Sequence, residues 1–487
     1  MAGRRAALAS AALIGDVRAL ARGAEMNDGI ATLAEVRSAL ASGGLSAQDI
    51  AKDTLARIER RNGDLHAFVA FHAERALADA RHIDALRRLG VRLGPLAGAP
   101  IGIKDIIDVA DLPTRAGSLT RGDAAAATQD APVVERLRAA GAIIIGKTHT
   151  VEYAFGGWGT NETIGTPHNP RDMSRPRVPG GSSSGSGVAV AAGLCVAALG
   201  SDTGGSIRLP ASFCGVVGLK TTFGLVDKRG VIPLTPMLDS IGPLTNSVAD
   251  AAALLGVLAP AQDWRRPGWT QRLDALAYGQ GAEIAGRRIG VIADLGADLH
   301  ADTARVFART RARLQALGAS EIEISLPRAL RDLSAPCGDL LAIEAYRLYG
   351  HLAEADPSLL GAPVRKRILA GRDIPAHRLM SLLEDREERK REMALLFERF
   401  DAILTPTTPF PAPTLADYDE EAAPGVFTRF VNYLDLAALS LPMGATKDGL
   451  PIGMQIVVPG YCEPVALEIG AALEADRGLS SPMSDGA

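Results

Sequence analysis

Cysteine is scarce in this chain of 487 residues, and its four cysteines lie far apart. They are Cys195, Cys214, Cys337 and Cys462. None belongs to a CxxC pair or has a companion pair of histidines, so the spacing argues against a disulfide framework and against a zinc site. Unpaired cysteines suit a reducing compartment, and we expect a cytoplasmic protein that uses no metal or cofactor.

Long apolar runs and an excess of positive charge are missing too. No stretch of about 18 uninterrupted apolar residues occurs, which argues against a membrane-spanning helix. The net charge is -4 at pH 7. Lys and Arg are scattered among Asp and Glu, so no basic face for nucleic acid or an anionic membrane is expected. We expect a small-molecule partner, with a homodimer as one candidate assembly.

The composition is that of a globular protein with many tight turns. Hydrophobic residues make up 47% of the chain, which also holds 52 glycines and 29 prolines, so a large core is available. The length allows two or three domains or one large α/β unit. Residues 1–23 carry Arg4 and Arg5 before an alanine-rich stretch that Asp16 and Arg18 interrupt. We interpret this segment as an extension or an over-long start, not as an export signal.

Helical and strand patterns alternate along the chain. Ser46 can cap a helix together with Asp49, three residues later. Pro132 begins a helix that ends at Gly141, and the apolar residues 142–145 then indicate a buried strand. The same alternation predicts a strand at 288–293, a helix at 302–317, and strands at 321–324, 402–404 and 452–458. Helix followed by apolar strand is typical of α/β proteins.

Two further segments predict structure without chemistry. The charged run 384–392 is best explained as the solvated face of a helix laced with ion pairs. Residues 405–413 hold four prolines and predict a loop after a strand.

Two glycine-serine segments form the densest chemical signal. They are 180–187 (GGSSSGSG) and 200–208 (GSDTGGSIR), and the apolar run 188–199 between them predicts a helix. Such turns direct backbone N–H groups toward one point, which suits a bound anion or the oxyanion of an acyl-transfer intermediate. A flexible linker is excluded, because a linker would be polar throughout.

Together these segments resemble the amidase-signature family, whose hallmark is GGSSGGS, a small-residue helix and GSDTGGSIRxPA. Further matching segments are 100–105 (PIGIKD), 159–161, 165–170, 214–221, 404–409 and 449–455. The resemblance covers about 30–475 and implies a Ser-cisSer-Lys amidase. It implies a single large α/β/α domain with a central mixed β-sheet covered by helices. Within the amidase domain 30–475, the signature core spans about 100–245 and a helical covering segment about 330–400. Residues 1–29 and 476–487 remain as an extension and a tail.

The resemblance also assigns roles to residues. Ser206 matches the nucleophile, and Ser182, which lies 24 residues earlier, matches the relay serine that follows a cis peptide. Lys104 matches the base. An unperturbed lysine titrates near about 10.4, so burial must lower the pKa of Lys104 if the amine is to accept a proton at neutral pH. The implied oxyanion hole consists of Thr203, Gly204, Gly205 and the Ser206 amide.

Substrate contacts are less well specified by the sequence. Gly157, Trp158 and Tyr153 are candidates for an acyl pocket, although aromatic residues beside an apolar strand are more often core. Arg208 could reach a substrate carboxylate, but pairing with an acid such as Asp202 is favoured. Amides, carbamates and urea-type bonds all present an acyl carbon to such a triad, and urethane or ester side activity is compatible with it.

Two other interpretations compete with amide hydrolysis. Residues 141–148 match GxxxxGK[ST], but Ala-Ile-Ile-Ile is β-branched and apolar and should lie in a strand, not around phosphates. Residues 181–185 match the GxSxG elbow of Ser-His-Asp hydrolases. The later histidines His300, His351 and His377 fall in charged surroundings and are expected at the surface. Cys214 is expected to be buried packing.

The chain departs from the family pattern at several positions. Ser184 stands where glycine is usual, Thr222 replaces a proline, and 432–438 (NYLDLAA) replaces NxxGLPA, so the family pattern does not define that side of the pocket. The alternative function is the glutaminase subunit of a tRNA-dependent amidotransferase. A site that reads glutamine needs an acid, and Gly425 stands at the position where the acid is expected.

Overall fold

The computed structural model describes residues 29–326, 328–422 and 424–479. An 11-stranded mixed sheet runs through it in the order β1-β3-β2-β4-β6-β5-β10-β11-β9-β7-β8. The strands are β1 (Phe68–Phe71), β2 (Pro100–Lys104), β3 (Ile143–Thr148), β4 (Ala197–Asp202), β5 (Val217–Lys220), β6 (Ser240–Thr245), β7 (Arg288–Ile292), β8 (Ser320–Ile324), β9 (Ala402–Pro406), β10 (Ala437–Ala445) and β11 (Pro451–Val458). Neighbours β3, β2 and β4 are parallel, as are β9, β7 and β8, whereas the strands between them pair antiparallel.

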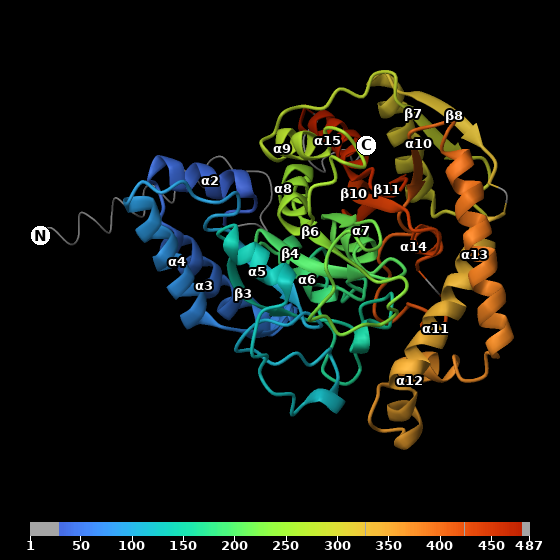
Figure 1. The fold of residues 1–487 in the computed structure, drawn as a ribbon, viewed down its shortest axis with the longest axis horizontal. Helices are drawn as coiled ribbons and strands as arrows, with labels where there is room; N and C mark the ends of the chain where they lie inside the picture. The colour runs from blue at the N-terminus through green and yellow to red at the C-terminus, as the bar shows by residue number, and fades with distance from the viewer. Residues whose placement is uncertain (1–28, 327, 423, 480–487) are drawn as a thin grey trace, which may run out of the picture.

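Helices cover both faces of this sheet, and the mixed α/β/α fold class is confirmed (Figure 1). They are α2 (Leu33–Ser42), α3 (Ala47–Leu65), α4 (Ala73–Arg88), α5 (Pro132–Ala139), α6 (Ser184–Ala191), α7 (Arg208–Cys214), α8 (Val248–Leu258), α9 (Trp269–Ala277), α10 (Ala301–Ala316), α11 (Leu330–Ala355), α12 (Ala362–Leu369), α13 (Ala376–Leu396), α14 (Arg429–Tyr433) and α15 (Glu463–Leu479), with short 3-10 turns at Leu119–Arg121 and Glu152–Ala154. Successive strand residues point to opposite faces. On β10, Leu439 packs against Gly470 of α15. On β11, Gln455 meets Arg208 of α7 on the opposite face.

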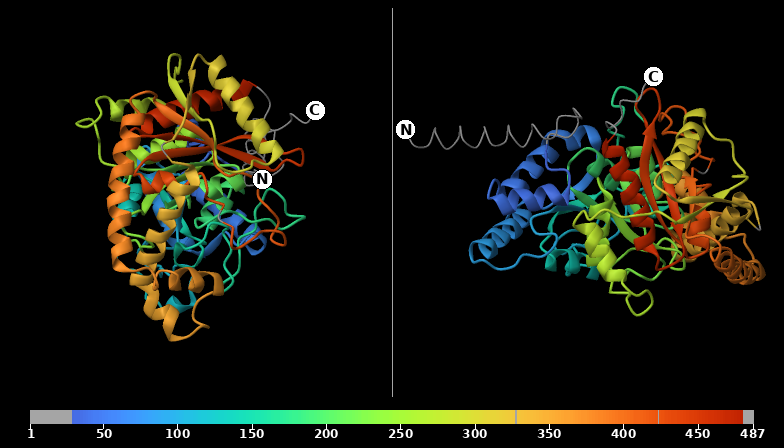
Figure 2. Two further views of the ribbon diagram at one scale, coloured as in Figure 1. Left: turned by 90° about the vertical axis from the view of Figure 1, so that its right-hand side faces the viewer. Right: turned by 90° about the horizontal axis from the view of Figure 1, so that it is seen from above.

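Helices α2 to α4 lie at one end of the sheet, and α10 to α13 lie with β7 and β8 at the other (Figures 1 and 2). The glycine-serine segments occupy the middle, where α6 and α7 pack on β4 and β5. The centre of the sheet is therefore where side chains from distant parts of the chain converge.

Several predicted element boundaries are confirmed. Ser46 caps α3, and a reciprocal capping box joins it to Asp49. Pro132 opens α5, and the following strand extends from Ile143 to Thr148. The three isoleucines of the nucleotide-binding motif thus lie within β3, as their β-branched side chains predict, and Gly-Lys-Thr continues the same strand.

The apolar run 188–199 is not one helix, and that prediction is wrong in its second half. Helix α6 ends at Ala191, Gly193 adopts a φ of 67°, and Ala197 begins β4. A residue in the left-handed region ends an α-helix, and glycine reaches it without steric cost. Because a short apolar run suits a buried helix and a buried strand equally, periodicity alone does not separate the two.

The charged run on α13 is also more than a solvated face. Arg386 is 7% exposed and donates to the Tyr433 carbonyl and to Asp435. Lys390 pairs with Glu387 on its own helix and with Asp435. The helix is therefore tied to the segment 432–438 in which this chain departs from the family pattern.

The predicted extension 1–29 lies almost wholly outside the described residues. At the other end, α15 reaches Leu479, past the boundary at residue 475 predicted for the domain. Within the described part of the chain, no helix combines the length and apolar character needed to cross a membrane.

Lys147, the lysine of the nucleotide-binding motif, forms a buried ion pair with Asp105. Their side chains are 0% and 2% exposed, and Nζ lies 2.9 Å from the carboxylate. Lys147 also donates to Thr114. The ammonium group of Lys147 is therefore buried and paired within the protein, so it is not available to bind a phosphate.

We predict that Lys147→Met lowers the free energy of unfolding by about 3–5 kcal/mol, because it leaves the Asp105 carboxylate buried without its partner. Urea unfolding checks this. Arg229→Met, which removes the exposed partner of Asp227, serves as control and should leave the transition where it is. An unchanged urea midpoint for Lys147→Met would show that the buried pair has no structural role.

Candidate active site

Lys104 is the last residue of β2, and its amine is held in the interior by hydroxyl groups. Nζ donates to Ser182 Oγ at 2.7 Å and to Ser201 Oγ at 2.8 Å. Both Lys104 and Ser182 are completely buried. Among the described residues no carboxylate forms an ion pair with Lys104. The buried amine thus faces two groups that can accept or return a proton.

This environment shifts the pKa of Lys104 toward neutrality. Burial disfavours the ammonium and lowers the pKa to about 7, while the charges of Asp239 and Asp202 oppose the fall. A substantial fraction of the amine is therefore neutral near pH 7. The condition that the resemblance places on a lysine base is met by the surroundings of Lys104.

The first glycine-serine segment presents Ser182, and the second presents Ser206. The peptide between Gly181 and Ser182 is cis. Ser206 follows β4, is 8% exposed, and its carbonyl accepts from Ser183 N–H at 3.2 Å. Within the described structure no hydrogen bond joins the two hydroxyls directly. Catalytic contacts of this kind often tighten only when substrate binds.

The four residues of the predicted oxyanion hole are not equivalent. The N–H of Gly205 donates to Asp202 Oδ1 at 2.8 Å and is therefore already engaged. The N–H groups of Thr203, Gly204 and Ser206 have no acceptor among the residues that the structure describes. Gly205 itself has a φ of 134°, a conformation that favours glycine. The geometry leaves Thr203, Gly204 and Ser206 as the free donors and makes Gly205 the turn residue.

Arg208 is buried and fully engaged by protein groups. It donates to both oxygens of Asp202, to Asn432 Oδ1, to Gln455 Oε1 and to the carbonyl of Thr428. These contacts use all five donors of the guanidinium. The structural interpretation of Arg208 therefore holds, and its candidacy as a substrate contact is corrected: no N–H remains for a ligand.

A cavity of about 110 Å³ opens above Ser206. Its lining includes the free oxyanion donors, the predicted contacts Gly157 and Trp158, Leu341 of α11 and Arg367 of α12. The helical segment 330–400 thus contributes to the wall of the cavity that Ser206 lines. Trp158 is only 3% exposed and packs with Phe213, Phe410 and Tyr418, so most of its ring belongs to a small aromatic core.

Tyr153 does not line that cavity. Its ring contacts the ring of Tyr349 with centroids 4.2 Å apart, and its hydroxyl pairs with Thr120 at 2.7 Å. Tyr153 therefore packs in the interior and does not face the cavity, in line with the alternative that aromatic residues beside an apolar strand belong to the core.

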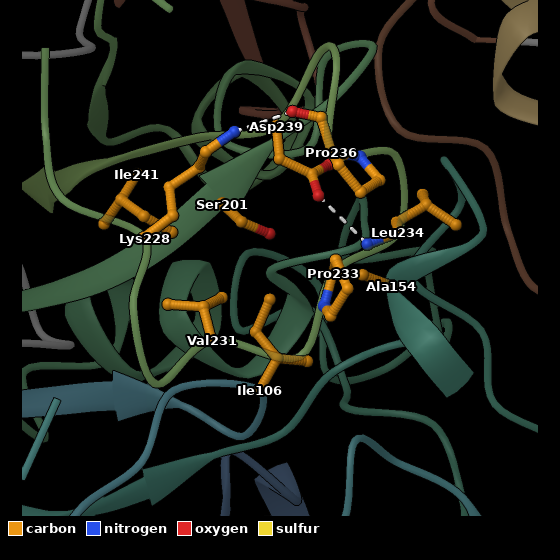
Figure 3. A pocket seen from close by; sticks show the side chains of 10 residues that line it. All are labelled: Ile106, Ala154, Ser201, Lys228, Val231, Pro233, Leu234, Pro236, Asp239 and Ile241. Carbon is orange, nitrogen blue, oxygen red and sulfur yellow. Dashed lines mark hydrogen bonds between the residues drawn. The ribbon is translucent and has the colours of Figure 1, made fainter. Parts of the chain in front are cut away.

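A second cavity, of about 180 Å³, lies behind Ser201 and shares Ala154 and Leu234 with the first (Figure 3). Asp239 lines it and accepts from Thr203 Oγ1 at 2.6 Å. Burial raises the pKa of Asp239 to about 6, against the hydrogen bond from Thr203 and the charge of Lys228. Asp239 therefore binds Thr203 of the predicted oxyanion hole, and its negative charge also raises the pKa of Lys104.

Sequence reasoning missed Ser201 and Asp239. Ser201 lies in the motif already singled out, three residues before Gly204, but nothing in the motif shows that its hydroxyl faces Lys104. Asp239 lies 33 residues after Ser206, on the segment that leads into β6. Only the pairing of β6 with β4 brings it to the site.

The competing interpretations receive no support from the positions of their residues. His300, His351 and His377 are all exposed, at the start of α10, on α11 and on α13. Cys214 is fully buried, and burial raises the pKa of its thiol to about 12. No group of three or more His, Cys, Asp or Glu residues in the described chain is arranged to hold a metal ion.

Several known proteins are similar to this chain along most of its length. A family model described as Amidase matches residues 49–466. One glutamyl-tRNA(Gln) amidotransferase subunit, from Koribacter versatilis, is 35% identical over 92% of this chain and 99% of that protein. An inhibitor-bound structure, described as a vestigial complex that reveals the origins of an s-triazine catabolic enzyme, has a TM-score of 0.84 and 32% identity, over 92% of this chain and 98% of that one. The native peptide amidase of Stenotrophomonas maltophilia has a TM-score of 0.76 and 30% identity, over 91% and 96% of the two chains.

Proposed function

The chain belongs to the amidase family of hydrolases that act on C–N bonds, and on that premise we propose that it cleaves an amide, carbamate or related acyl bond through Ser206, Ser182 and Lys104. The observation that carries the proposal is the buried amine of Lys104, which is hydrogen-bonded to the hydroxyl groups of Ser182 and Ser201. A neutral amine in that position can accept a proton, which an ion-paired lysine cannot do.

Proton transfer then follows the contacts. Ser206 Oγ attacks the acyl carbon, its proton passes to Ser182 Oγ, and the proton of Ser182 passes to Lys104 Nζ. The tetrahedral intermediate collapses, the C–N bond breaks, and the leaving nitrogen takes a proton back along the same route. Water then attacks the acyl-serine ester and gives a proton to Lys104 through Ser182. As the ester C–O bond breaks, that proton returns through Ser182 to Ser206 Oγ, so the acid is released and the Ser206 hydroxyl is restored.

Negative charge on the acyl oxygen is the second requirement of this reaction. The free N–H groups of Thr203, Gly204 and Ser206 are the donors proposed to stabilise it. Asp202 fixes their turn through Gly205 and Ile207, whose N–H groups both donate to its carboxylate. Such fixed donors stabilise the transition state without reorganising during the reaction.

Glutamine hydrolysis is the second candidate, favoured by the name of the Koribacter versatilis relative. The position predicted for an acid that reads glutamine is Gly425, which lines the cavity above Ser206. A buried polar contact is worth several orders of magnitude in selectivity, and the glycine supplies none. We therefore place simple amides and carbamates ahead of glutamine.

We predict that Ser206→Ala abolishes turnover and labelling by a fluorophosphonate, and that Ser182→Ala and Lys104→Met each lower kcat by on the order of 10³-fold or more. Steady-state kinetics and intact-mass measurement check this. Ser184→Ala is the matched control, because Ser184 is buried in the same segment and its hydroxyl has no partner in the described structure. Turnover and labelling that persist in Ser206→Ala would refute the assignment.

The pH profile gives a second prediction. Because the neutral amine is the active form, kcat/KM should rise with pH through a midpoint near 7 and level off above it. Asp239→Asn removes a negative charge that raises the pKa of Lys104, so the midpoint should move to lower pH. Asparagine can still accept from Thr203, which makes the midpoint, not the absolute rate, the informative quantity. A midpoint that stays in place, or moves upward, would exclude Lys104 as the base.

We further predict that the purified chain alone hydrolyses a simple aryl amide or carbamate with a higher kcat/KM than it deamidates glutamine. The absence of an acid at Gly425 is the physical reason. Anilide release and ammonia release, measured on the same enzyme preparation, give the two constants. A clear preference for glutamine would favour the glutaminase candidate instead.

A further inference from the structure

Four charged residues line the cavity above Ser206, and one of them has no partner of opposite charge among the described residues. Arg367, Glu420, Glu421 and Arg429 line it. Arg367 forms an ion pair with Glu420, and Glu421 pairs with Lys366 at 2.6 Å. Within the described chain, Arg429 alone among these four has no hydrogen-bond or ion-pair partner for its side chain. The cavity therefore carries one uncompensated positive charge.

Arg429 is half-buried, and the buried network of the site fixes the chain that carries it. It is the first residue of α14, and the carbonyl of Thr428 just before it accepts from Arg208 at 3.0 Å. Thr428 Oγ1 donates to the carbonyl of Gly204 at 2.6 Å. These contacts anchor the backbone of Arg429 to the oxyanion turn, only a few ångströms from the nucleophile's loop.

The packing around Gly425 disfavours an acidic side chain close to the positive charge of Arg429. A Cβ at Gly425 would lie 2.9 Å from Thr428 Oγ1 and 3.1 Å from the carbonyl of Gly204, so the packing leaves little room for an acidic side chain. The Cγ of Arg429 lies 3.8 Å from the same point. A site that recognises glutamine needs a negatively charged group at this position. Here the position is a glycine, and the positively charged Arg429 lies beside it.

We propose that Arg429 binds an anionic group of the substrate, so that the preferred substrates of this site are amides or related acyl compounds that carry a carboxylate. The proposal deepens the proposed function and depends on it. A guanidinium presents a planar fork that matches a carboxylate through two parallel hydrogen bonds. A half-buried guanidinium without a partner of its own attracts an oppositely charged ligand.

The test uses the mono-4-nitroanilides of malonic, succinic and glutaric acid, each paired with the methyl ketone of the same length. In every pair only the carboxylate is replaced. For at least one length we expect kcat/KM to favour the acid by about tenfold or more, mainly through KM, in line with the usual strength of a charge-assisted contact. In Arg429→Gln the acid-to-ketone ratio should fall close to one, and Arg429→Lys should retain part of the preference. Arg391→Gln, an exposed arginine of α13, is the control and should keep the wild-type ratio.

A second readout separates failure of this inference from failure of the proposed function. The rate of fluorophosphonate labelling at Ser206 is measured with and without malonate, succinate or glutarate. Protection of the wild type that is lost in Arg429→Gln supports the anion site. Equal protection of both proteins, or none of either, overturns it, as does an acid-to-ketone ratio near one in the wild type or a preference that survives in Arg429→Gln. Failure of Ser206 to label at all contradicts the proposed function itself.

Discussion

Three lysines are buried on strands β2, β3 and β5 of this sheet, and the hydrogen-bond partners of Lys104 set it apart from the other two. Lys147 faces the carboxylate of Asp105, and Lys220 donates to the carbonyl of Leu436. Lys104 faces two serine hydroxyls. Burial lowers the pKa of all three lysines, to about 7 for Lys104 and to about 8 for Lys220, and the charge of Asp105 opposes the fall at Lys147. Of the three, only Lys104 has hydroxyl groups as its sole hydrogen-bond partners in the described structure, and such groups can pass a proton to or from the amine. The amine of Lys104 is shielded from solvent by the glycine-serine segments, the neighbouring strands and the helices that cover the sheet.

Asp202 is the second constraint, and it organises the opposite side of the site. Burial raises the pKa of this carboxyl, but the charge and hydrogen bonds of Arg208 and the amide of Asn432 outweigh burial and hold the pKa well below its usual range. The same carboxylate accepts from the N–H groups of Gly205 and Ile207. One buried anion thus sets the oxyanion turn and, through Arg208, the position of α14. Arg429, which follows Thr428, and the N–H groups of Thr203, Gly204 and Ser206 are therefore held by a single network.

The sequence could predict the residues of the site better than their surroundings. The resemblance to the amidase-signature motifs implied that Ser182, Ser206 and Lys104 belong to one centre. The position of Asp239 could not be predicted from the sequence, because this residue joins the site only through the long-range pairing of strands β4 and β6. The run 188–199 was misassigned because burial on all sides removes the periodicity that separates helix from strand. The departure at 432–438 proved to be where Asn432 binds Asp202 and Asp435 binds α13.

The proposed mechanism depends on a neutral amine at Lys104, and the most direct test is to titrate that amine. Protein labelled with carbon-13 and nitrogen-15 at lysine is followed by NMR across pH, and the Lys104 signal is assigned by its loss in Lys104→Met. We expect a midpoint near 7, far below the value of about 10.4 for a free lysine side chain. A Lys104 side chain that stays protonated until that alkaline range would contradict the mechanism.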